Sequence, residues 1–425
     1  MITPCVNACP LKSDIPEWVT AIQRKELAVA YRILTQKNPF PGICGEICHH
    51  PCEKDCLRGQ FDKNISIKKL EKRVSDAFWF KVDAGTNKVV RFRNVPRKEE
   101  KVAIIGAGPA GMACAWCLLW YGYQITIFEA SDRIGGMPAL AIPESRLSIK
   151  ILLRDFEPVI HHPFTTIKLN TTISSISDFR KGAFNAIVIA TGAHDNKSLD
   201  IPGENQPHVI SGLRFLKKTK DKKEKLISPT DAIIVIGEGN TAINSAIIAK
   251  QLGASRVEVF CSCEKKNVPT TGGMTDLAKK EGVGFNFLLT PAKIEAKKIV
   301  FTNVILGEKR TIHPVGKTSF KIISATGEKP SLPEIPQQKI PRRVFICGDA
   351  ISGPSFVSNA IASGIETGEK IHRFLSLGTT LLEKKTDEMV TNISDIDLSS
   401  FEKSPQNQES PFLEAERCFS CKPIS

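Results

Sequence analysis

The sequence lacks any apolar run that approaches the length needed to cross a lipid bilayer, which excludes a membrane-spanning protein. Its first residues lack the basic start and the apolar core of a secretory signal, so we expect a cytoplasmic protein. It also lacks a basic stripe with interleaved aromatic residues and any nucleic-acid-binding motif, although its net charge is +13. We therefore expect no nucleic acid as a partner. The excess of lysine and arginine indicates a solvated surface that suits an acidic partner.

The chain contains 425 residues, too many for one ordinary core, so we expect two or three domains. A hydrophobic content of 41% and a charged content of 24% are typical of a soluble globular protein. Thirteen cysteines are many for a reducing compartment, where thiols serve as metal ligands or catalytic groups rather than disulfides. Most of them lie in two places, the first 56 residues and the last eight: Cys5, Cys9, Cys44, Cys48, Cys52, Cys56, Cys418 and Cys421.

The N-terminal cysteine-rich region is predicted to consist of short helices and loops. Residues 15–36 have helical spacing of apolar positions, and residues 65–80 have a similar pattern. Between them, residues 38–56 contain too much proline, glycine and cysteine for a long regular element. The inward positions expected in the first helical segment are Trp18, Ile22, Ala30, Ile33 and Leu34.

From residue 101 onward, short apolar strands alternate with glycine turns and helices. KVAIIGAGPAGMACAWCLLWYG and DAIIVIGEGNTAINSAIIAKQLG each predict a strand, a glycine turn and a helix, followed by the strands QITIFEA and RVEVFCS. FNAIVIATG and RRVFICGDA predict further strands, and NAIASGIETGEKIHRFLS predicts a helix. This alternation is typical of an α/β fold with parallel sheets, and its two similar openings indicate two Rossmann-like nucleotide-binding domains.

The first glycine turn, Gly106–Gly111, lies directly between a strand and a helix. Gly106 permits the tight turn, Gly108 lets the backbone approach a pyrophosphate at the helix N-terminus, and Gly111 lets helix and strand pack closely. Glu129 ends the next strand, where a carboxylate can accept hydrogen bonds from a ribose. Together these features predict dinucleotide binding; a tight turn in an unrelated α/β fold is the alternative.

The second glycine turn runs from Gly237 to Ala242, and the alanine is a permitted variant of the third glycine. The residue that reads the second ribose is expected after RVEVF, where the chain has Cys261–Lys266. Lys265 and Lys266 could meet a 2′-phosphate, but no arginine is present there. We expect a nicotinamide nucleotide at this turn. The alternatives are a solvated lysine loop and a nucleotide fold that no longer binds tightly.

The last apolar strand ends in Cys347-Gly348-Asp349. A carboxylate in this position can hold the ribityl chain of a flavin or bind phosphate oxygens through water, although an ordinary helix N-cap is the alternative. The remaining apolar cysteines, Cys114 and Cys117, together with Cys347, are predicted to fill the core.

These motifs together resemble the glutamate synthase small-subunit family, whose module also forms the N-terminal half of dihydropyrimidine dehydrogenase and occurs in several electron-channelling flavoproteins. The resemblance covers roughly residues 1–375 and the two C-terminal cysteines. It rests on CVNACPLKSDIPEW, NPFPGICGEICHHPCEKDCLRG, ISIKKLE, IIGAGPAGMACA, GGMPALAIPESRLS, VIATGA, VIGEGNTAINSA and FICGDAISGPSFVSNAIASG, in that order.

The resemblance implies FAD on the first nucleotide domain, NADPH or NADH on the second, and two [4Fe-4S] clusters on a helical N-terminal domain. The implied domains are 1–98 (iron–sulfur), 99–197 with 342–375 (FAD), 198–341 (NAD(P)) and 376–425 (linker and C-terminal Cys-x-x-Cys segment). The implied FAD positions are Gly106, Gly108, Pro109, Ala110, Gly111, Glu129, Gly136, Arg146, Thr191, Gly192, Gly348 and Asp349. The implied nicotinamide nucleotide positions are Gly237, Gly239, Asn240 and Thr241, with Lys265 nearby.

The chain departs from the family pattern in two places. Ser262 and Cys263 stand where family members usually carry an arginine pair for the 2′-phosphate, which leaves the choice between NAD and NADP open. The segment Met137–Ala141 is poorer in charged and aromatic residues than its family counterpart.

One cluster site is expected at Cys48, Cys52 and Cys56, whose short spacing suits thiolate ligands of iron. In the family, the fourth ligand of this cluster is often a Glu or Gln at the end of the stretch seen here as ISIKKLE, which implies Glu71. Cys44 is the all-cysteine alternative.

The other cluster of the family uses one continuous run, Glu-x-x-Arg-Cys-x-x-Cys followed by Cys-x3-Cys-Pro. Here the second part begins the chain, with Cys5 and Cys9, and the first part ends it, with Cys418 and Cys421. By this resemblance we expect the two ends to meet and close one cluster within the chain, as in a circular permutation. Completion by a second copy or a partner, a vestigial site and a zinc site are the alternatives.

The sequence contains no acid–base or nucleophilic constellation that suggests chemistry on a separate organic substrate. The resemblance therefore implies an oxidoreductase subunit that passes electrons from NAD(P)H through FAD and [4Fe-4S] clusters to a protein redox partner or catalytic subunit, and an oligomer is compatible with this function. One alternative is an electron-wiring flavoprotein subunit that no longer uses a nicotinamide cofactor. Another is a basic zinc protein with degenerate nucleotide folds that binds RNA or acidic proteins.

Overall fold

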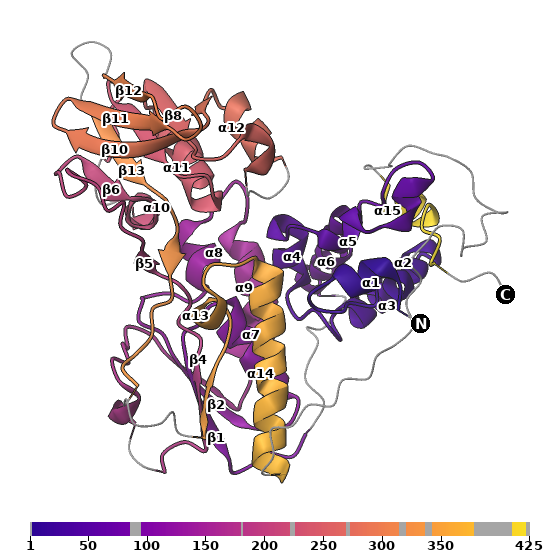
Figure 1. Cartoon of the computed structure of the whole chain (residues 1–425). Coiled ribbons are helices and arrows are strands. Elements are labelled where there is room, and N and C mark those ends of the chain that lie inside the picture. The colour runs from indigo at the N-terminus through magenta and orange to yellow at the C-terminus, as the bar shows by residue number, and fades with distance from the viewer. Residues whose placement is uncertain are drawn as a thin grey trace. The chain divides into compact units, whose positions relative to one another are not determined.

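The computed structural model describes residues 2–85, 95–179, 182–221, 226–268, 273–313, 320–335, 342–377 and 410–421. The chain divides into two compact units (Figure 1). The first unit comprises Met1–Gly136, Arg146–Thr191 and Leu332–Ser425, and the second comprises Met137–Ser145 and Gly192–Ser331. The FAD/NAD(P) boundaries expected at 198 and 341 therefore differ from the observed ones, because the short ribbon of β5 (Asp195–Asn196) and β14 (Glu328–Lys329) belongs to the second unit. Most of the expected linker lies outside the described residues.

The first unit begins with short helices that pack around a shared apolar core. They are α1 (Pro4–Ala8), α2 (Ile15–Gln23), α3 (Leu27–Leu34), α4 (Pro41–Ile47), α5 (Pro51–Lys54), the 3₁₀ helix η1 (Leu57–Gln60) and α6 (Ile67–Asp83). Residues 15–36 thus form two helices rather than one, because Lys25 adopts a left-handed conformation with φ of 62° between them. Of the inward positions predicted there, Ile33 is only partly buried and the other four are buried.

The second part of the first unit is a five-stranded parallel sheet with the order β15-β4-β1-β2-β3. Its strands are β1 (Lys101–Ile105), β2 (Gln124–Phe128), β3 (Thr165–Lys168), β4 (Ala186–Ile189) and β15 (Val344–Ile346). The helices of this part are α7 (Pro109–Leu119), α9 (Ile149–Ile160), η2 (Ile176–Asp178), α13 (Asp349–Ser352) and α14 (Val357–Leu377). The long helix α14 runs beside α7 (Figure 1), and a Cβ added at Gly364 would lie 2.1 Å from the Ala110 carbonyl oxygen.

The helical part and the sheet part of the first unit are joined by specific contacts. The buried Asp155 of α9 accepts a hydrogen bond of 2.7 Å from the backbone N–H of Ile43 in α4. The His49 ring stacks on the Phe356 ring just before α14, with ring centroids 3.8 Å apart. These contacts place the cysteine-rich helices against the first nucleotide-binding fold.

The second unit contains another five-stranded parallel sheet, with the order β6-β13-β7-β8-β9. Its strands are β6 (Val209–Ser211), β7 (Ala232–Ile236), β8 (Arg256–Phe260), β9 (Gly284–Asn286) and β13 (Phe320–Ser324). A three-stranded antiparallel sheet follows β9: β10 (Leu289–Glu295), β11 (Lys298–Asn303) and β12 (Lys309–Ile312). The remaining helices are α8 (Gly136–Ala141), which begins at the unit boundary, and α10 (Gly212–Asp221), α11 (Asn240–Gln251), η3 (Lys265–Asn267) and α12 (Met274–Lys280).

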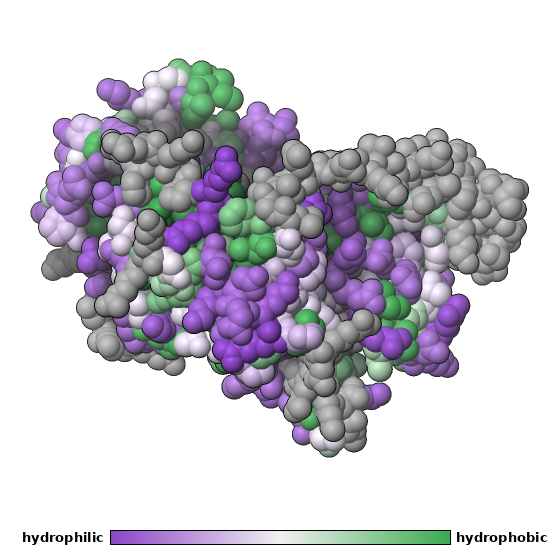
Figure 2. Space-filling model, turned by 90° about the horizontal axis from the view of Figure 1, so that it is seen from below, coloured by the Kyte–Doolittle hydropathy of each residue, from purple (hydrophilic) through white to green (hydrophobic). Residues whose placement is uncertain are grey.

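The predicted fold class is confirmed, because both expected βαβ openings lie in parallel sheets. In the described part of the chain, no helix has the combination of length and apolar character that a membrane crossing requires. On the face shown in Figure 2, hydrophobic residues form separate groups between hydrophilic ones. Scattered apolar groups of this kind are ordinary on protein surfaces.

Candidate cysteine-lined and dinucleotide-binding sites

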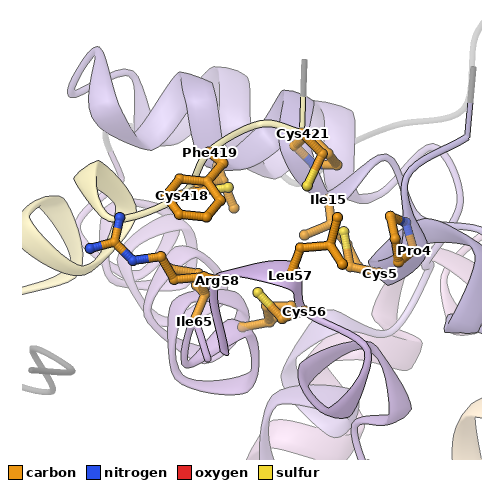
Figure 3. Close-up of a pocket in the computed structure, with 13 residues that line it drawn as sticks. Pro4, Cys5, Ile15, Cys56, Leu57, Arg58, Ile65, Cys418, Phe419 and Cys421 are labelled. Carbon is orange, nitrogen blue, oxygen red and sulfur yellow. The ribbon is translucent and has the colours of Figure 1, made fainter. Parts of the chain in front are cut away.

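The first cysteine-lined pocket lies between the N-terminal helices and the C-terminal segment. Cys5 of α1, Cys56 before η1, and Cys418 and Cys421 after α15 (Pro411–Glu416) line it. Figure 3 shows the sulfur atoms of these residues directed toward one central space. Four thiols from three separate segments thus converge, two of them from residues more than 400 positions away from Cys5.

The C-terminal segment is attached to the helical part by buried polar contacts. Glu414 is 1% exposed, and its Oε1 accepts a hydrogen bond of 2.8 Å from the backbone N–H of Ser66. Arg417 is 5% exposed and donates to Glu414, to the Asp62 carboxylate and to the Lys63 carbonyl. Because buried charges are tolerated only when they are paired, these contacts fix the segment next to α6.

A second arginine closes the wall of this pocket. Arg58 donates twice to the Asp62 carboxylate, at 2.7 Å each, and once to the Arg417 carbonyl oxygen at 3.0 Å. Its guanidinium also lies 4.7 Å from the centroid of the Phe419 ring, which sits between the two C-terminal cysteines in the sequence. In the sequence, only the proximity of Arg58 to Cys56 indicates a role in this pocket.

The second cysteine-lined pocket contains Cys9, Cys44, Cys48 and Cys52 together with the carboxylate of Glu71. Glu71 is 8% exposed, and its Oε1 accepts a hydrogen bond of 2.6 Å from the Asn38 side-chain amide. Its Oε2 lies 3.7 Å from His50 Nε2. Both candidates for a fourth ligand, Glu71 and Cys44, therefore lie in the same pocket.

The structure groups the cysteines differently from the sequence-based expectation. Cys56 takes the expected place of Cys9 in the first pocket, and Cys9 takes the expected place of Cys56 in the second. The physical reason is that both residues lie outside helices in extended backbone, Cys9 at the end of α1 and Cys56 before η1. The last thiol of each Cys-x3-Cys run therefore reaches the neighbouring pocket, a crossover also found in two-cluster ferredoxins.

The neighbours that shift the pKa values of the thiols follow the same grouping. Burial, and then the neighbouring Cys5 and Cys56, raise the pKa of Cys421 to about 12. Burial also raises the pKa of Cys9 to about 11, with Glu71 and Cys48 as neighbouring groups that raise it further. Burial alone would raise the pKa of Cys48, but hydrogen bonds with His49 and His50 lower it to about 6. Crowded buried thiols of this kind need a cationic group before they can ionise together.

The thiols that line the two pockets are the donor groups by which proteins hold iron–sulfur clusters. Among the described residues, no three His, Cys, Asp or Glu side chains form a group that could hold a single metal ion. Backbone N–H groups point at two of the sulfurs, from Ser420 to Cys418 and from His50 to Cys48, at 3.4 Å each. Hydrogen bonds to sulfur are a feature by which proteins tune iron–sulfur clusters.

The first glycine turn lies between β1 and α7 and has the geometry of a dinucleotide-binding turn. Gly106 has φ of 109°, and a Cβ there would lie 2.4 Å from the Ala190 carbonyl oxygen. A Cβ at Gly111 would lie 2.1 Å from the Gly106 carbonyl oxygen, so the third glycine permits the close packing of helix and strand. A Cβ at Gly108 would have only Gly136 as a neighbour, at 3.7 Å, which leaves the approach to the backbone open.

The other predicted flavin positions surround this turn. Glu129 follows β2 and accepts a hydrogen bond of 2.8 Å from the backbone N–H of Ala107. Gly348 comes close to Ala110, since a Cβ there would lie 2.6 Å from the Ala110 Cβ. Asp349 begins α13, and burial raises the pKa of its carboxyl, which also accepts a hydrogen bond from Ser355.

The four remaining predicted flavin positions are Pro109, Arg146, Thr191 and Gly192. Pro109 is the first residue of α7, where proline suits the helix start. Thr191 and Gly192 stand at the boundary between the two units, with Gly192 at φ of 72°. Arg146 lies near Lys68 of α6, whose pKa is lowered by burial and by this cation.

The second glycine turn lies between β7 and α11. Gly237 has φ of 136°, and a Cβ there would lie 2.1 Å from the Ala325 carbonyl oxygen, whereas a Cβ at Gly239 would meet nothing within 4 Å. Asn240 and Thr241 begin α11. Lys265 is exposed in η3, downstream of β8. The turn can therefore present backbone N–H groups to a phosphate in the same way as the first turn.

Two family models match the chain. The model described as pyridine nucleotide-disulphide oxidoreductase matches residues 100–364. The model described as dihydropyrimidine dehydrogenase domain II, 4Fe-4S cluster, matches residues 2–82. The two matches coincide with the two nucleotide-binding folds and with the helical cysteine-rich part.

Several characterised proteins are similar over most of this chain. The NADPH-Fe(3+) oxidoreductase subunit beta of Geobacter sulfurreducens is 28% identical, over 97% of this chain and 68% of the relative. The NADP(+)-dependent formate dehydrogenase subunit beta of Moorella thermoacetica is 30% identical, over 89% of this chain and 60% of the relative. The glutamate synthase (NADPH) small chain of Azospirillum brasilense is 27% identical, over 87% and 86% of the two chains.

Solved structures share the fold. A 2-naphthoyl-CoA reductase complex matches 66% of this chain and 41% of its own, with a TM-score of 0.55 and 24% identity. FprA of Mycobacterium tuberculosis in complex with NADPH matches 65% of this chain and 85% of its own, with a TM-score of 0.53 and 14% identity. The chain thus spans well under half of the first structure and about two thirds of the Geobacter relative.

Proposed function

Because the chain belongs to the pyridine nucleotide-disulphide oxidoreductase family and is an FAD- and NAD(P)-dependent oxidoreductase with a [4Fe-4S] domain, we propose that it oxidises a nicotinamide nucleotide and delivers the electrons to a partner protein. The observation that carries this proposal is that one chain combines two dinucleotide-binding turns with two separate cysteine-lined pockets. Bound FAD would supply the conversion between two-electron nucleotide chemistry and one-electron transfer.

The residues around the first turn would hold the flavin nucleotide. The N–H groups at the start of α7 are available to a pyrophosphate, and Gly108 leaves room for its approach. The carboxylate of Glu129 would accept hydrogen bonds from the adenosine ribose, and Asp349 would face the ribityl chain or a phosphate-bound water. The residues of the second turn, Gly237 to Thr241, would hold the nicotinamide nucleotide in the same manner.

The two pockets would hold two [4Fe-4S] clusters. Cys5, Cys56, Cys418 and Cys421 would ligate the first through four thiolates, within a single chain. Cys9, Cys48 and Cys52 would supply three ligands of the second. We favour Glu71 as the fourth because its carboxylate is buried in the pocket and fixed by Asn38, with Cys44 as the alternative.

The acceptor would be a protein redox partner or a catalytic subunit in the cytoplasm. The Geobacter and Moorella relatives are named as beta subunits, which supports a role inside a complex. The net charge of +13 supports an acidic docking surface on the partner.

The proposal predicts that anaerobic addition of NADH or NADPH bleaches the flavin absorbance of the purified protein. A Gly237→Val variant is the matched control, because its side chain would collide with the Ala325 carbonyl and distort the turn. It should retain bleaching by dithionite and lose bleaching by the nucleotide. If dithionite bleaches the intact protein and neither nucleotide does, the nicotinamide step is wrong, and the protein is an electron-wiring flavoprotein between other proteins.

A further inference from the structure

The second glycine turn carries a carboxylate in an unusual place. Glu238 is the residue between Gly237 and Gly239, and its side chain is partly exposed. Its Oε2 accepts a hydrogen bond of 3.0 Å from the Ser262 hydroxyl and one of 3.2 Å from the backbone N–H of Cys263. The carboxylate therefore lies over the end of β8, at the loop where a ribose is expected to be read.

At each glycine turn, a carboxylate links the turn to the segment after the neighbouring strand, but the two carboxylates come from different segments. In the first turn, Glu129 follows β2 and accepts a hydrogen bond from the N–H of Ala107, the residue between the glycines. In the second turn, Glu238 occupies the position of Ala107 and accepts a hydrogen bond from the N–H of a residue after β8. In the first site the carboxylate belongs to the end of the strand, and in the second site it belongs to the turn. In both sites a hydrogen bond joins the turn to the segment after the strand.

The residue that replaces Glu129 cannot take over the reading of a ribose. Cys261 directly follows β8, is fully buried, and its thiol lies 3.7 Å from the Gly237 carbonyl oxygen. Burial raises its pKa to about 12, so it stays neutral. Glu238 is therefore the anionic acceptor at this end of the second site.

The lysines near this turn do not cancel the negative charge of Glu238. Lys266 pairs with Glu264 at 2.9 Å, and both Lys265 and Lys266 are exposed on η3. Ser262 directs its hydroxyl at Glu238 and carries no charge. A 2′-phosphate at this position would meet the Glu238 carboxylate, whereas a 2′-hydroxyl could donate a hydrogen bond to it.

We propose that Glu238, positioned by Ser262 and the Cys263 N–H, selects NADH and rejects NADPH at the second turn. This inference rests on the proposed function, because it assumes that a nicotinamide nucleotide binds there. The proposed preference for NADH differs from the NADPH that appears in the names of the Geobacter and Azospirillum relatives. Rejection by like charge is a common source of specificity.

The test compares the two nucleotides on the FAD-loaded full chain. Binding of ADP and of 2′,5′-ADP is measured by calorimetry, and anaerobic flavin reduction is measured with NADH and NADPH. We expect the intact protein to prefer the nucleotides without the 2′-phosphate by at least about tenfold in both measurements. Glu238→Gln, which keeps the shape, and Glu238→Ser, which opens space, should each shrink this preference by about tenfold or more. Glu281→Gln, which removes an exposed carboxylate at the end of α12, should leave it unchanged.

The outcomes separate this inference from the function on which it rests. A preference of the intact protein for 2′,5′-ADP and NADPH would overturn the role of Glu238 and leave the nicotinamide step standing. An unchanged preference in both Glu238 variants would also overturn it. Absence of binding and of reduction by every nucleotide tested would overturn the proposed function, and the role of Glu238 with it.

Discussion

Replacing Cys56 together with Cys418 should remove no more iron than replacing Cys418 alone, whereas replacing Cys9 together with Cys418 should remove about twice as much. With two four-iron clusters, the first pair should leave about four of about eight irons, and the second pair should leave almost none. The reason is that Cys56 and Cys418 line one pocket while Cys9 lines the other. Iron and acid-labile sulfide per FAD, measured on anaerobically purified alanine variants, would report both losses.

The matched control for the cysteine variants is Cys114→Ala. Cys114 is fully buried in α7, away from both pockets, so its replacement tests the loss of a thiol without loss of a ligand. It should keep the full iron content. The grouping proposed here is contradicted if Cys9 and Cys418 behave as members of one cluster and Cys56 as a member of the other, as the resemblance to the family implied.

Arg417→Met should release the C-terminal segment and empty the first cluster site. The change leaves the buried carboxylates of Glu414 and Asp62 without their shared partner. Breaking a buried ion pair by removing one side costs about 3–5 kcal/mol, so the segment should open more than about 100-fold more often. Hydrogen exchange of the amides of residues 411–421 should accelerate accordingly, and the iron content should fall by about half.

The control for this change is Lys370→Met on α14. Lys370 forms an exposed ion pair with Glu366 at 3.0 Å, and such surface pairs contribute about 0–1 kcal/mol. The exchange of residues 411–421 and the iron content should not change in this variant. If Arg417→Met also leaves both unchanged, the C-terminal segment does not depend on its buried polar contacts, and the closed intramolecular site is wrong.

The strands and glycine turns were predictable because their signals are local. Apolar runs followed by glycine and a helical pattern identified β1, β2, β7 and β8, and both parallel sheets followed from the alternation. The positive φ angles of Gly106 and Gly237 agree with the tight turns expected there. The three-stranded sheet β10–β12 was not foreseen, since its strands carry no turn or glycine motif comparable to these.

The cysteine grouping was not predictable, because spacing in the sequence does not specify which way a capping residue points. Cys9 and Cys56 each leave a short helix in extended backbone, and only the packing of α1 on α5 brings them to opposite pockets. The role of Glu238 was also hidden, since a carboxylate inside a glycine turn acquires meaning only when Ser262 and Cys263 are seen beside it.

The central claim is that electrons from a nicotinamide nucleotide reach iron–sulfur groups carried by this same chain. The most direct test is an anaerobic titration of the intact protein with NADH, in which flavin absorbance and the low-temperature EPR spectrum are recorded on the same samples. We predict that the flavin bleaches and that a reduced iron–sulfur signal appears with it, weakened but present when Cys418 and Cys421 are replaced by alanine. Bleaching without any iron–sulfur signal in the intact protein would contradict this claim.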